Sequence, residues 1–354
     1  MSSLHFHPLR VCERHADGDD AVVIGFAVPP DLVPTFHFEA GQYLTLRTQT
    51  NSGELRRSYS ICAAPGEALR VGVRRVPGGA FTNWLHDTLA VGDTIEAMPP
   101  QGRFGAALSR PSRHVLAVAG GSGITPILSL IRSVLTRDAS TRVTLLYGNR
   151  KAASTMFKEE LEDLKNRYLT RFVLHAVFSR EVMYSPLHGG RLDAAKIATL
   201  LRLTGPVDEA FICGPHAMNN EAEAALLAAG LAPDHIHIER FGIPPSPADA
   251  TLHAAREGDA GTAVITIVRD GLAREIGFGS GDDSILAASA RAGLDVPYSC
   301  RSGVCATCRA KLISGRVRMD RNFALERDDI EAGFVLTCQA HPLTERVVVS
   351  FDER

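Results

Sequence analysis

The sequence lacks a marked excess of charge of either sign and lacks a long uninterrupted hydrophobic run. Its formal net charge is −2, which gives no reason to expect a nucleic-acid partner. The most apolar stretch, residues 114–131, is interrupted by three glycines and a proline, so it does not resemble a membrane span. The N-terminal residues contain no apolar core of the kind found in signal peptides. We therefore expect a globular protein that binds neither nucleic acid nor membrane.

Cysteine is also scarce, with seven residues in a chain of 354. Three of them, Cys12, Cys62 and Cys213, are scattered, which is unlike a disulfide framework. Disulfides are rare in reducing compartments, so this usage favours a cytoplasmic protein.

The other four cysteines form the most informative pattern in the sequence. Cys300, Cys305 and Cys308 follow a C-x4-C-x2-C spacing, and Cys338 lies well downstream. This spacing is typical of plant-type [2Fe-2S] clusters, in which four thiolates hold two irons. The alternative is a structural zinc site, but zinc sites use paired C-x2-4-C units, which this pattern matches poorly. We predict that all four cysteines are cluster ligands.

The first third of the chain is rich in short β-type runs separated by turn residues. The clearest runs are 21–28, 43–48, 69–75 and 94–98. Short strands at this spacing predict an antiparallel barrel or sandwich.

The middle third alternates strand and helix patterns. A buried-type strand at 115–119 leads into a Gly-rich turn, after which apolar residues recur at helical spacing. Thr125 is expected to cap this helix, with Pro126 at its first position. Further strands are expected at 143–147, 172–178 and 209–213. Such alternation predicts a parallel sheet covered by helices.

The Gly-rich turn itself predicts an anion site. Gly120, Gly121 and Gly123 precede a helix N-terminus, where free backbone N–H groups and the helix dipole favour a phosphate. The spacing is not the G-x-G-x-x-G of the ordinary dinucleotide fingerprint.

Beyond a Pro-rich segment at 243–261, the last third has its own strand and helix patterns. We expect strands at 263–268, 273–278 and 347–351, and a helix at 284–292 ahead of the cysteine loop.

Two segments of the first third resemble the flavin site of the ferredoxin–NADP reductase superfamily: Arg57-Ser58-Tyr59-Ser60 and Gly78-Gly79-Ala80-Phe81-Thr82. The resemblance implies that Arg57 pairs with a flavin phosphate, Tyr59 packs on the isoalloxazine ring, and Ser60 hydrogen-bonds near N5. An Arg fork matches phosphate oxygens, and an aromatic face suits a flat ring. The implied FAD ligands are Arg57, Ser58, Tyr59, Ser60, Gly78, Gly79, Phe81 and Thr82. Taken alone, these residues are also compatible with an ordinary strand and a hairpin turn.

The middle third is similar to the nicotinamide domain of the same superfamily, through its Gly-Gly-Ser-Gly-Ile-Thr-Pro loop at 120–126 and its Cys-Gly-Pro at 213–215. The resemblance places Cys213 beside the nicotinamide and makes Tyr59, Ser60 and Cys213 the catalytic residues. As a residue type, Cys213 is equally a small buried hydrophobe. The implied nucleotide ligands are Gly120, Gly121, Gly123, Thr125, Pro126, Arg150, Ser179, Arg180, Cys213, Gly214 and Pro215.

Ser179-Arg180 resembles the pair that recognises the 2′-phosphate of NADPH, and Arg150 is a second candidate. Arg suits a phosphate dianion, so NADPH is expected rather than NADH. Phe241 resembles an aromatic residue that covers the other face of the flavin, although a packing role is the alternative.

The last third resembles the plant-type ferredoxin fold, a small β-grasp. The implied architecture is an FAD-binding β-barrel at 1–107, an NAD(P)-binding α/β domain at 108–242, a linker at 243–261 and a [2Fe-2S] ferredoxin domain at 262–354.

This order of parts implies an electron path. A hydride carries two electrons together, a [2Fe-2S] cluster takes one at a time, and a flavin can do both. No recognisable oxygen-activating iron motif is present, so the final acceptor is expected to be another protein. Four segments resemble the reductase subunits of ring-1,2-phenylacetyl-CoA epoxidases: 55–62, 146–150, 209–215 and 303–308. This resemblance implies NADPH-dependent reduction of a diiron oxygenase in phenylacetate catabolism. The alternatives are the reductase of a steroid or other aromatic-ring hydroxylase, and a ferredoxin-like redox sensor or electron-transfer adaptor without turnover.

Overall fold

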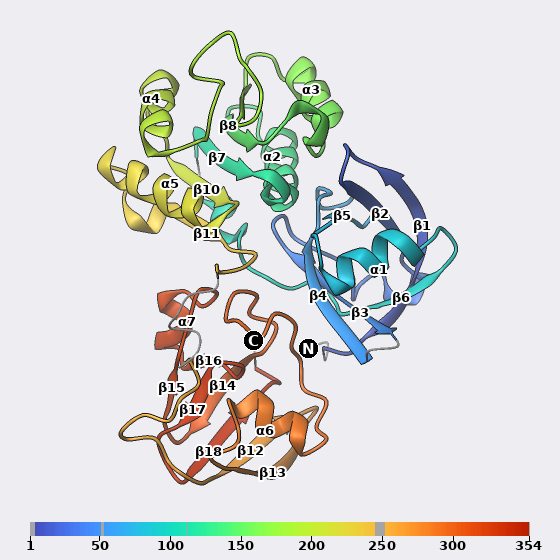
Figure 1. Cartoon of the computed structure of the whole chain (residues 1–354), viewed down its shortest axis with the longest axis vertical. Coiled ribbons are helices and arrows are strands. Elements are labelled where there is room, and N and C mark those ends of the chain that lie inside the picture. Colours follow the sequence, from blue (N-terminus) through green and yellow to red (C-terminus); the bar gives the residue numbers. More distant parts are fainter. Residues whose placement is uncertain (1–3, 51–52, 111, 245–251, 354) are drawn as a thin grey trace. The chain divides into compact units, whose positions relative to one another are not determined.

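The computed structural model describes residues 4–50, 53–110, 112–244 and 252–353. By internal contacts the chain divides into two compact units. One comprises Phe6–Phe241, and the other comprises Gly242–Arg354 together with Met1–His5. Figure 1 shows both units, and each is described here by itself.

The first unit begins with a six-stranded antiparallel sheet in the order β4-β3-β6-β1-β2-β5. Its strands are β1 (His7–Ala16), β2 (Ala21–Ala27), β3 (Tyr43–Thr50), β4 (Gly53–Ser60), β5 (Arg70–Arg74) and β6 (Thr94–Ala97). A bridge between Ile61 and Val71 joins the end of β4 to β5, so the first and last strands meet. The predicted antiparallel barrel is confirmed, and the four predicted runs lie on β2, β3, β5 and β6.

Helix α1 (Ala80–Thr88) follows β5 and buries Phe81 and Leu85 against the inside of this barrel. Gly79 stands at its N-cap position. The hairpin-turn alternative for Gly78 and Gly79 is therefore wrong, because this turn leads into a helix rather than into a neighbouring strand.

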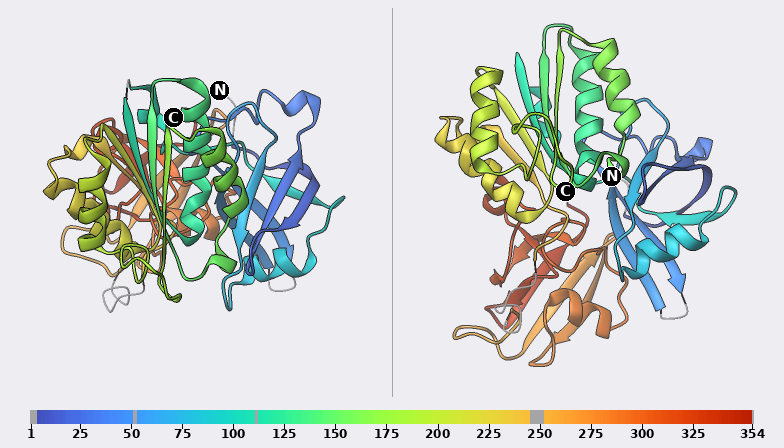
Figure 2. Two further views of the ribbon diagram at one scale, coloured as in Figure 1. Left: turned by 90° about the horizontal axis from the view of Figure 1, so that it is seen from above. Right: turned by 45° about the horizontal axis from the view of Figure 1, so that its top comes forward.

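A parallel five-stranded sheet forms the rest of the first unit, in the order β11-β10-β7-β8-β9. The strands are β7 (His114–Gly120), β8 (Arg142–Asn149), β9 (Phe172–Phe178), β10 (Glu209–Cys213) and β11 (Ile236–Glu239). Helices α2 (Ile124–Arg137) and α3 (Lys158–Arg167) share a buried cluster with one face of the sheet, and α4 (Ala194–Thr204) and α5 (His216–Ala228) share another with the opposite face. Figure 2 shows these helices on the two sides of the sheet. The predicted parallel α/β sheet is confirmed.

Helix α2 begins earlier than the sequence suggested. Its N-cap is Gly123, not Thr125, because a 3-10 turn over Gly121–Gly123 leads directly into the helix. The Thr125 hydroxyl lies within the first turn and donates to the carbonyl of Ser122 at 3.0 Å, so it does not cap the helix. Pro126 consequently stands at the third helical position rather than the first.

The second unit contains a mixed five-stranded sheet in the order β13-β12-β18-β14-β16, together with a two-stranded sheet of β15 and β17. The strands are β12 (Ala263–Arg269), β13 (Leu272–Phe278), β14 (Arg309–Ser314), β15 (Val317–Met319), β16 (Phe334–Leu336), β17 (Ala340–Pro342) and β18 (Arg346–Ser350). Helix α6 (Ile285–Arg291) packs on the sheet and is capped by Ser284, whose hydroxyl accepts from Ala287 N at 3.2 Å. Helix α7 (Arg327–Glu331) lies ahead of β16. The predicted β-grasp architecture is confirmed.

No helix in the described ranges is long and apolar enough to cross a membrane.

Candidate electron-transfer sites

The predicted flavin motif lies on β4, paired with β3. Tyr59 pairs with Leu44 and Ser60 with Tyr43 across the ladder, and Ser60 is buried. Arg57 is exposed, whereas its neighbour Arg56 is buried and bound to Glu54 at 2.7 Å. Of these two arginines, Arg57 is the one placed to reach a ligand.

The surroundings of the Tyr59 side chain are those expected of a residue that contacts a flavin. Its hydroxyl is buried without a hydrogen-bond partner among the described residues, and its ring centroid lies 5.7 Å from that of Phe81. Burial raises the pKa of this hydroxyl, so it remains a neutral donor. Because a buried hydroxyl normally finds a partner, this arrangement fits a bound flavin that supplies an acceptor.

The turn before α1 fits a pyrophosphate. Gly78 has φ +74°, and a Cβ built on it would meet nothing within 4 Å, so its backbone is open to solvent. Thr82 fixes the turn, because its hydroxyl accepts from Val76 N at 3.2 Å and donates to Gly79 O at 3.3 Å. No described side chain caps the N-terminus of α1, so the N–H groups of its first turn are left for an anion, as pyrophosphate binding requires.

The nucleotide loop is held by glycine contacts with the end of β10. A Cβ on Gly123 would overlap the carbonyl of Cys213, and one on Gly214 would lie 2.9 Å from Gly120 N. A Cβ on Gly120 would lie 2.6 Å from Pro215 Cδ. The structure therefore brings together the two segments that the resemblance assigned to the dinucleotide, and these glycines permit the close approach.

One barrel residue that the sequence did not single out also reaches this loop. Arg74, at the end of β5, donates to Ser154 O and forms an ion pair with Asp20 at 3.0 Å. Its Nη1 is 2.7 Å from where a Cβ on Gly121 would stand, and Gly121 has φ +54°. Only its position in the fold reveals Arg74, since nothing in its local sequence suggests a nucleotide contact.

Cys213 is fully buried at the carboxyl end of β10 and pairs with Glu239 of β11. Burial, with a smaller contribution from the Glu239 carboxyl, raises the pKa of the Cys213 thiol, which is therefore protonated at neutral pH. The Oε2 atom of Glu239 is buried without a hydrogen-bond partner among the described residues, and burial raises the pKa of this carboxyl to about 8. Glu239 is a functional candidate to which the sequence reasoning assigned no role, although it begins the segment 239–242 that contains Phe241.

The two predicted arginines meet at the carboxyl edge of the sheet. Ser179 N donates to Asn149 O, and Arg180 N donates to Arg150 O, both at 2.9 Å. Arg150, Ser179 and Arg180 are exposed there. Asn149 is buried, and both atoms of its side-chain amide lack a hydrogen bond of normal geometry among the described residues. Ligands of open α/β sheets bind at this edge, so the arrangement is suited to a nucleotide.

Thr125 is buried beside the barrel, where its methyl group approaches Gly72. Phe241, the last residue of the first unit, is 46% exposed and thus available to a ligand or partner.

The predicted cluster ligands converge in the second unit. The thiols of Cys300 and Cys305 hydrogen-bond to each other, as do those of Cys308 and Cys338. The loop from Cys300 to Cys308 contains three residues with positive φ, namely Arg301 (57°), Gly303 (78°) and Ala306 (55°). A Cβ on Gly303 would lie 3.2 Å from Arg321 O, so glycine satisfies both the dihedral and the space.

Backbone and amide N–H groups already point at these sulfurs. Ser302 N donates to Cys300 Sγ at 3.4 Å, and Gln339 Nε2 lies 3.6 Å from Cys338 Sγ. The hydrogen bond from Cys305 lowers the pKa of Cys300 to about 5, while the same bond and burial raise the pKa of Cys305. Four converging sulfurs with N–H donors around them are the donor set of a [2Fe-2S] cluster, which these residues fit.

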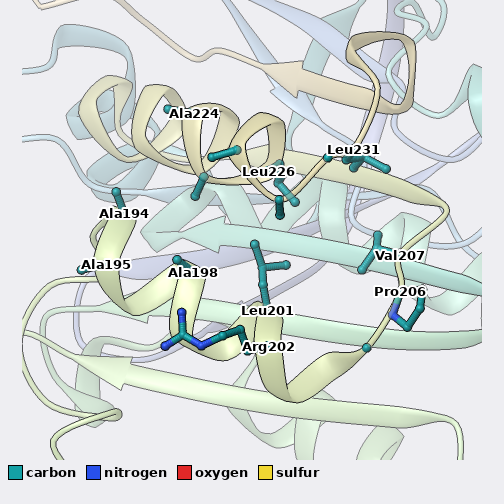
Figure 3. A pocket seen from close by; sticks show the side chains of 15 residues that line it. Ala194, Ala195, Ala198, Leu201, Arg202, Pro206, Val207, Ala224, Leu226 and Leu231 are labelled. Atoms are coloured by element: carbon teal, nitrogen blue, oxygen red, sulfur yellow. The ribbon is translucent and has the colours of Figure 1, made fainter.

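A separate cavity of about 990 Å³ lies between α4 and α5. Its lining is mostly alanine and leucine, with Arg202 the charged residue of the set (Figure 3). None of the predicted site residues lines it, so it is distinct from the nucleotide edge of the sheet.

Comparison with protein families divides the chain in the same order. Residues 8–105 match an oxidoreductase FAD-binding domain, residues 117–224 an oxidoreductase NAD-binding domain, and residues 267–343 a 2Fe-2S iron-sulfur cluster binding domain. These matches establish the flavin, nicotinamide and cluster cofactors as classes.

Curated relatives match over nearly the whole chain. A subunit of the 1,2-phenylacetyl-CoA epoxidase of Escherichia coli is 43% identical over 99% of this chain and 98% of its own. The ferredoxin reductase component of 3-ketosteroid-9-alpha-monooxygenase from Rhodococcus rhodochrous is 33% identical over 96% of this chain and 95% of its own.

Among solved structures, phthalate dioxygenase reductase superposes with a TM-score of 0.62 at 23% identity, covering 98% of this chain and 98% of that one. An intact type IV self-sufficient cytochrome P450 monooxygenase gives a TM-score of 0.72 at 21% identity, covering 97% of this chain and 41% of that protein. At these identities the structures support the fold. The sequence matches go further: this chain belongs to the family of oxygenase reductase components in which an FAD-binding, an NAD-binding and a [2Fe-2S] domain follow one another.

Proposed function

We propose that this protein carries electrons from NADPH through FAD and a [2Fe-2S] cluster to the diiron oxygenase component of a phenylacetyl-CoA epoxidase. The observation that carries the partner assignment is the 43% identity to the E. coli epoxidase subunit, over 99% of the chain. The reducing cytoplasm, where dispersed thiols remain free, is the compartment that suits this chemistry.

The flavin is held, in this proposal, by residues of the barrel. Arg57 binds a flavin phosphate, the first turn of α1 receives the pyrophosphate, and Tyr59 donates its unpaired hydroxyl to the bound group. Ser60 lies next to Tyr59 on β4, and it contacts the ring near N5. Bound FAD supplies the conversion of a two-electron hydride into single electrons.

The nicotinamide is placed by the two loops at 120–126 and 213–215. Because the Cys213 thiol is neutral, it packs beside the ring without adding charge and does not act as a thiolate nucleophile. Its partner Glu239, with a raised pKa, holds a proton below about pH 8 and so also avoids a buried charge.

The proposed preference for NADPH over NADH depends on Arg150 and Arg180. Backbone hydrogen bonds join the loop after β8, which contains Arg150, to the loop after β9, which contains Arg180. Both arginines therefore lie at the same edge of the sheet. A paired arginine site matches a 2′-phosphate dianion, which NADH lacks.

The test measures NADPH oxidation by the purified protein with a purified phenylacetyl-CoA oxygenase component, with and without phenylacetyl-CoA. We expect NADPH and O2 consumption to depend on the substrate. Failure to drive that oxygenase, despite ready reduction of cytochrome c, would overturn the partner and leave the reductase chemistry intact.

A second candidate partner follows from the ketosteroid monooxygenase reductases, which are 33–34% identical to this chain. Their oxygenase component provides the matched comparison in the same assay. Faster substrate-coupled turnover with the ketosteroid oxygenase would make that candidate the correct one.

A further inference from the structure

Two histidines and an aspartate meet in the second unit, apart from the four cluster cysteines. His253 precedes β12, Asp320 follows β15, and His341 lies on β17. Asp320 Oδ2 is 3.0 Å from His253 Nδ1 and 2.8 Å from His341 Nε2. The two imidazole nitrogens are 3.4 Å apart. Three segments distant in sequence therefore direct one donor atom each to a common point.

These spacings approach those of a metal site. Tetrahedral zinc with bonds of about 2.0–2.1 Å has its ligand atoms about 3.3 Å apart. The observed edges of 2.8, 3.0 and 3.4 Å describe one slightly contracted face of such a tetrahedron. The aspartate oxygen therefore needs to move away from the two nitrogens by only a few tenths of an ångström to convert the hydrogen-bonded triad into a three-ligand site.

The surroundings hold the three donors in place. The Asp320 side chain is fully buried, and its other oxygen, Oδ1, binds Arg256 at 2.9 Å and also Arg318. Arg318 is in turn fixed by Asp259 at 2.6 Å. Hydrogen bonds on the distal carboxylate oxygen are what orient metal-ligating carboxylates, and they leave Oδ2 directed at the histidines.

The imidazole rings are oriented as well. His341 is 5% exposed in its side chain and lies between His253, stacked at 5.6 Å, and Phe278, edge-on at 6.3 Å. His253 is 24% exposed, so a fourth ligand from solvent can enter on its side.

Ligand type and charge select the kind of ion. Two imidazoles and one carboxylate form a donor set that no sequence motif revealed, and they suit zinc and other transition metals, ferrous iron included, whereas magnesium and calcium prefer oxygen ligands. The positive charges of Arg256 and Arg318 offset the negative charges of Asp259 and Asp320. A divalent ion at this site therefore adds two positive charges that no described ion pair offsets. A hydroxide or other anion at the open position would offset part of that charge.

We propose that His253, Asp320 and His341 bind a zinc-class divalent ion, with the fourth position open to solvent. The ion would fasten the segment ahead of β12, which lies within the predicted linker, to β17, which begins shortly after the cluster ligand Cys338. This site shares no ligand with the cluster and does not depend on the identity of the oxygenase partner.

The test uses tag-free full-length protein with its cluster intact, verified as two irons per chain. Zinc per chain is measured by elemental analysis after equilibrium dialysis against micromolar zinc. We expect one zinc per chain in the wild type, and at least tenfold weaker binding in Asp320→Asn and His341→Gln. His5→Gln is the matched control, since His5 belongs to the same unit and pairs with Asp270 on the surface.

Zinc should also raise the unfolding temperature of the second unit in the wild type and the His5 control, but not in the other two variants. Absence of bound zinc in the wild type, or equal binding in all four proteins, would overturn the proposal. Zinc that increases only as iron is lost, regardless of the variant, would belong to the cysteines and would overturn it equally.

Discussion

The cluster ligands and the nucleotide-binding residues are distributed along the chain in opposite ways. Three of the four cluster cysteines lie within nine residues of one loop, Cys300–Cys308, with Cys338 the distant member. The predicted nucleotide ligands instead lie at the ends of β7, β8, β9 and β10, strands that together extend from residue 114 to residue 213.

The two sites therefore differ in what holds them together. In the cluster loop, positive φ at Arg301, Gly303 and Ala306 curls one short segment around its own thiols. In the nucleotide site, parallel strand pairing brings Cys213 beside Glu239, and bare glycine backbones let the loops at 120–123 and 213–214 touch. One site depends on local conformation and the other on long-range packing, so they should fail independently.

The largest effect is expected from removing a cluster ligand. Cys305→Ser should abolish the [2Fe-2S] cluster and its reduced-state EPR signal, because the cluster requires four thiolates. Bleaching of the flavin by NADPH should be unchanged, since the flavin and nucleotide residues lie in the other unit. Cys12→Ser, at an exposed cysteine outside the cluster, is the matched control and should retain both signals. Loss of flavin bleaching in Cys305→Ser would show that the two units are not independent.

The next effect concerns the glycine contact of the nucleotide site. In Gly123→Ala the added methyl group overlaps the carbonyl of Cys213, so the two loops must separate. Overpacking of about 1–3 kcal/mol corresponds to roughly 5- to 150-fold weaker nucleotide binding, measured by titration of flavin bleaching. The cluster EPR signal should remain. Gly189→Ala, where a Cβ meets nothing closer than 3.6 Å, is the control, and a similar loss there would remove this explanation.

A smaller and more selective effect is expected at the strand edge. Arg180→Ala should weaken NADPH by roughly tenfold or more, because a charge-assisted hydrogen bond is worth about 1.5–3 kcal/mol. NADH affinity should change little. Steady-state KM values for both nucleotides provide the measurement, with Arg202→Ala on α4 as an exposed arginine control. Equal losses for NADPH and NADH would contradict the proposed 2′-phosphate contact.

The last effect is of a different kind, a pH dependence of stability in the first unit. The pKa of Glu239 is raised from 4.5 to about 8 in the folded state, so the folded protein keeps a proton that the unfolded chain releases. Its stabilising contribution is complete below about pH 4.5 and falls as the pH rises to about 8, by up to about 1.4 kcal/mol per pH unit. Glu239→Gln should flatten this fall in the unfolding transition of the first unit. An unchanged pH slope in the variant would show that Glu239 ionises normally.

Prediction from sequence succeeded where the signal was local or repeated. The strands predicted at 172–178 and 209–213 coincide with β9 and β10, because both are short, mostly apolar runs, although only β10 is buried throughout and β9 lies at the sheet edge. The predicted α2 cap is misplaced because Thr125 is a favourable cap type, yet a 3-10 turn starts the helix two residues earlier. The type of residue at a single position does not predict a 3-10 turn ahead of a helix.

The missed residues share a physical reason. Arg74 reaches the nucleotide loop from the barrel, and Glu239 becomes a candidate only through its pairing with Cys213. Neither has a distinctive local motif. The assigned roles of the flavin and nucleotide residues, and the domain boundaries at 107, 242 and 261, stay predictions that the proposed variants and truncations can test.

The sequence by itself predicted the cluster and an anion site, because cysteine spacing and glycine placement are local requirements of the groups they bind, and its resemblance to a known superfamily predicted the flavin and nicotinamide cofactors and their order. Only the tertiary structure decided which buried groups face each other. It paired Cys213 with Glu239, left the Tyr59 hydroxyl without a partner among the described residues, and joined His253, Asp320 and His341. Such encounters depend on strand order and burial, which follow from the packing of the whole chain and not from any short segment of it.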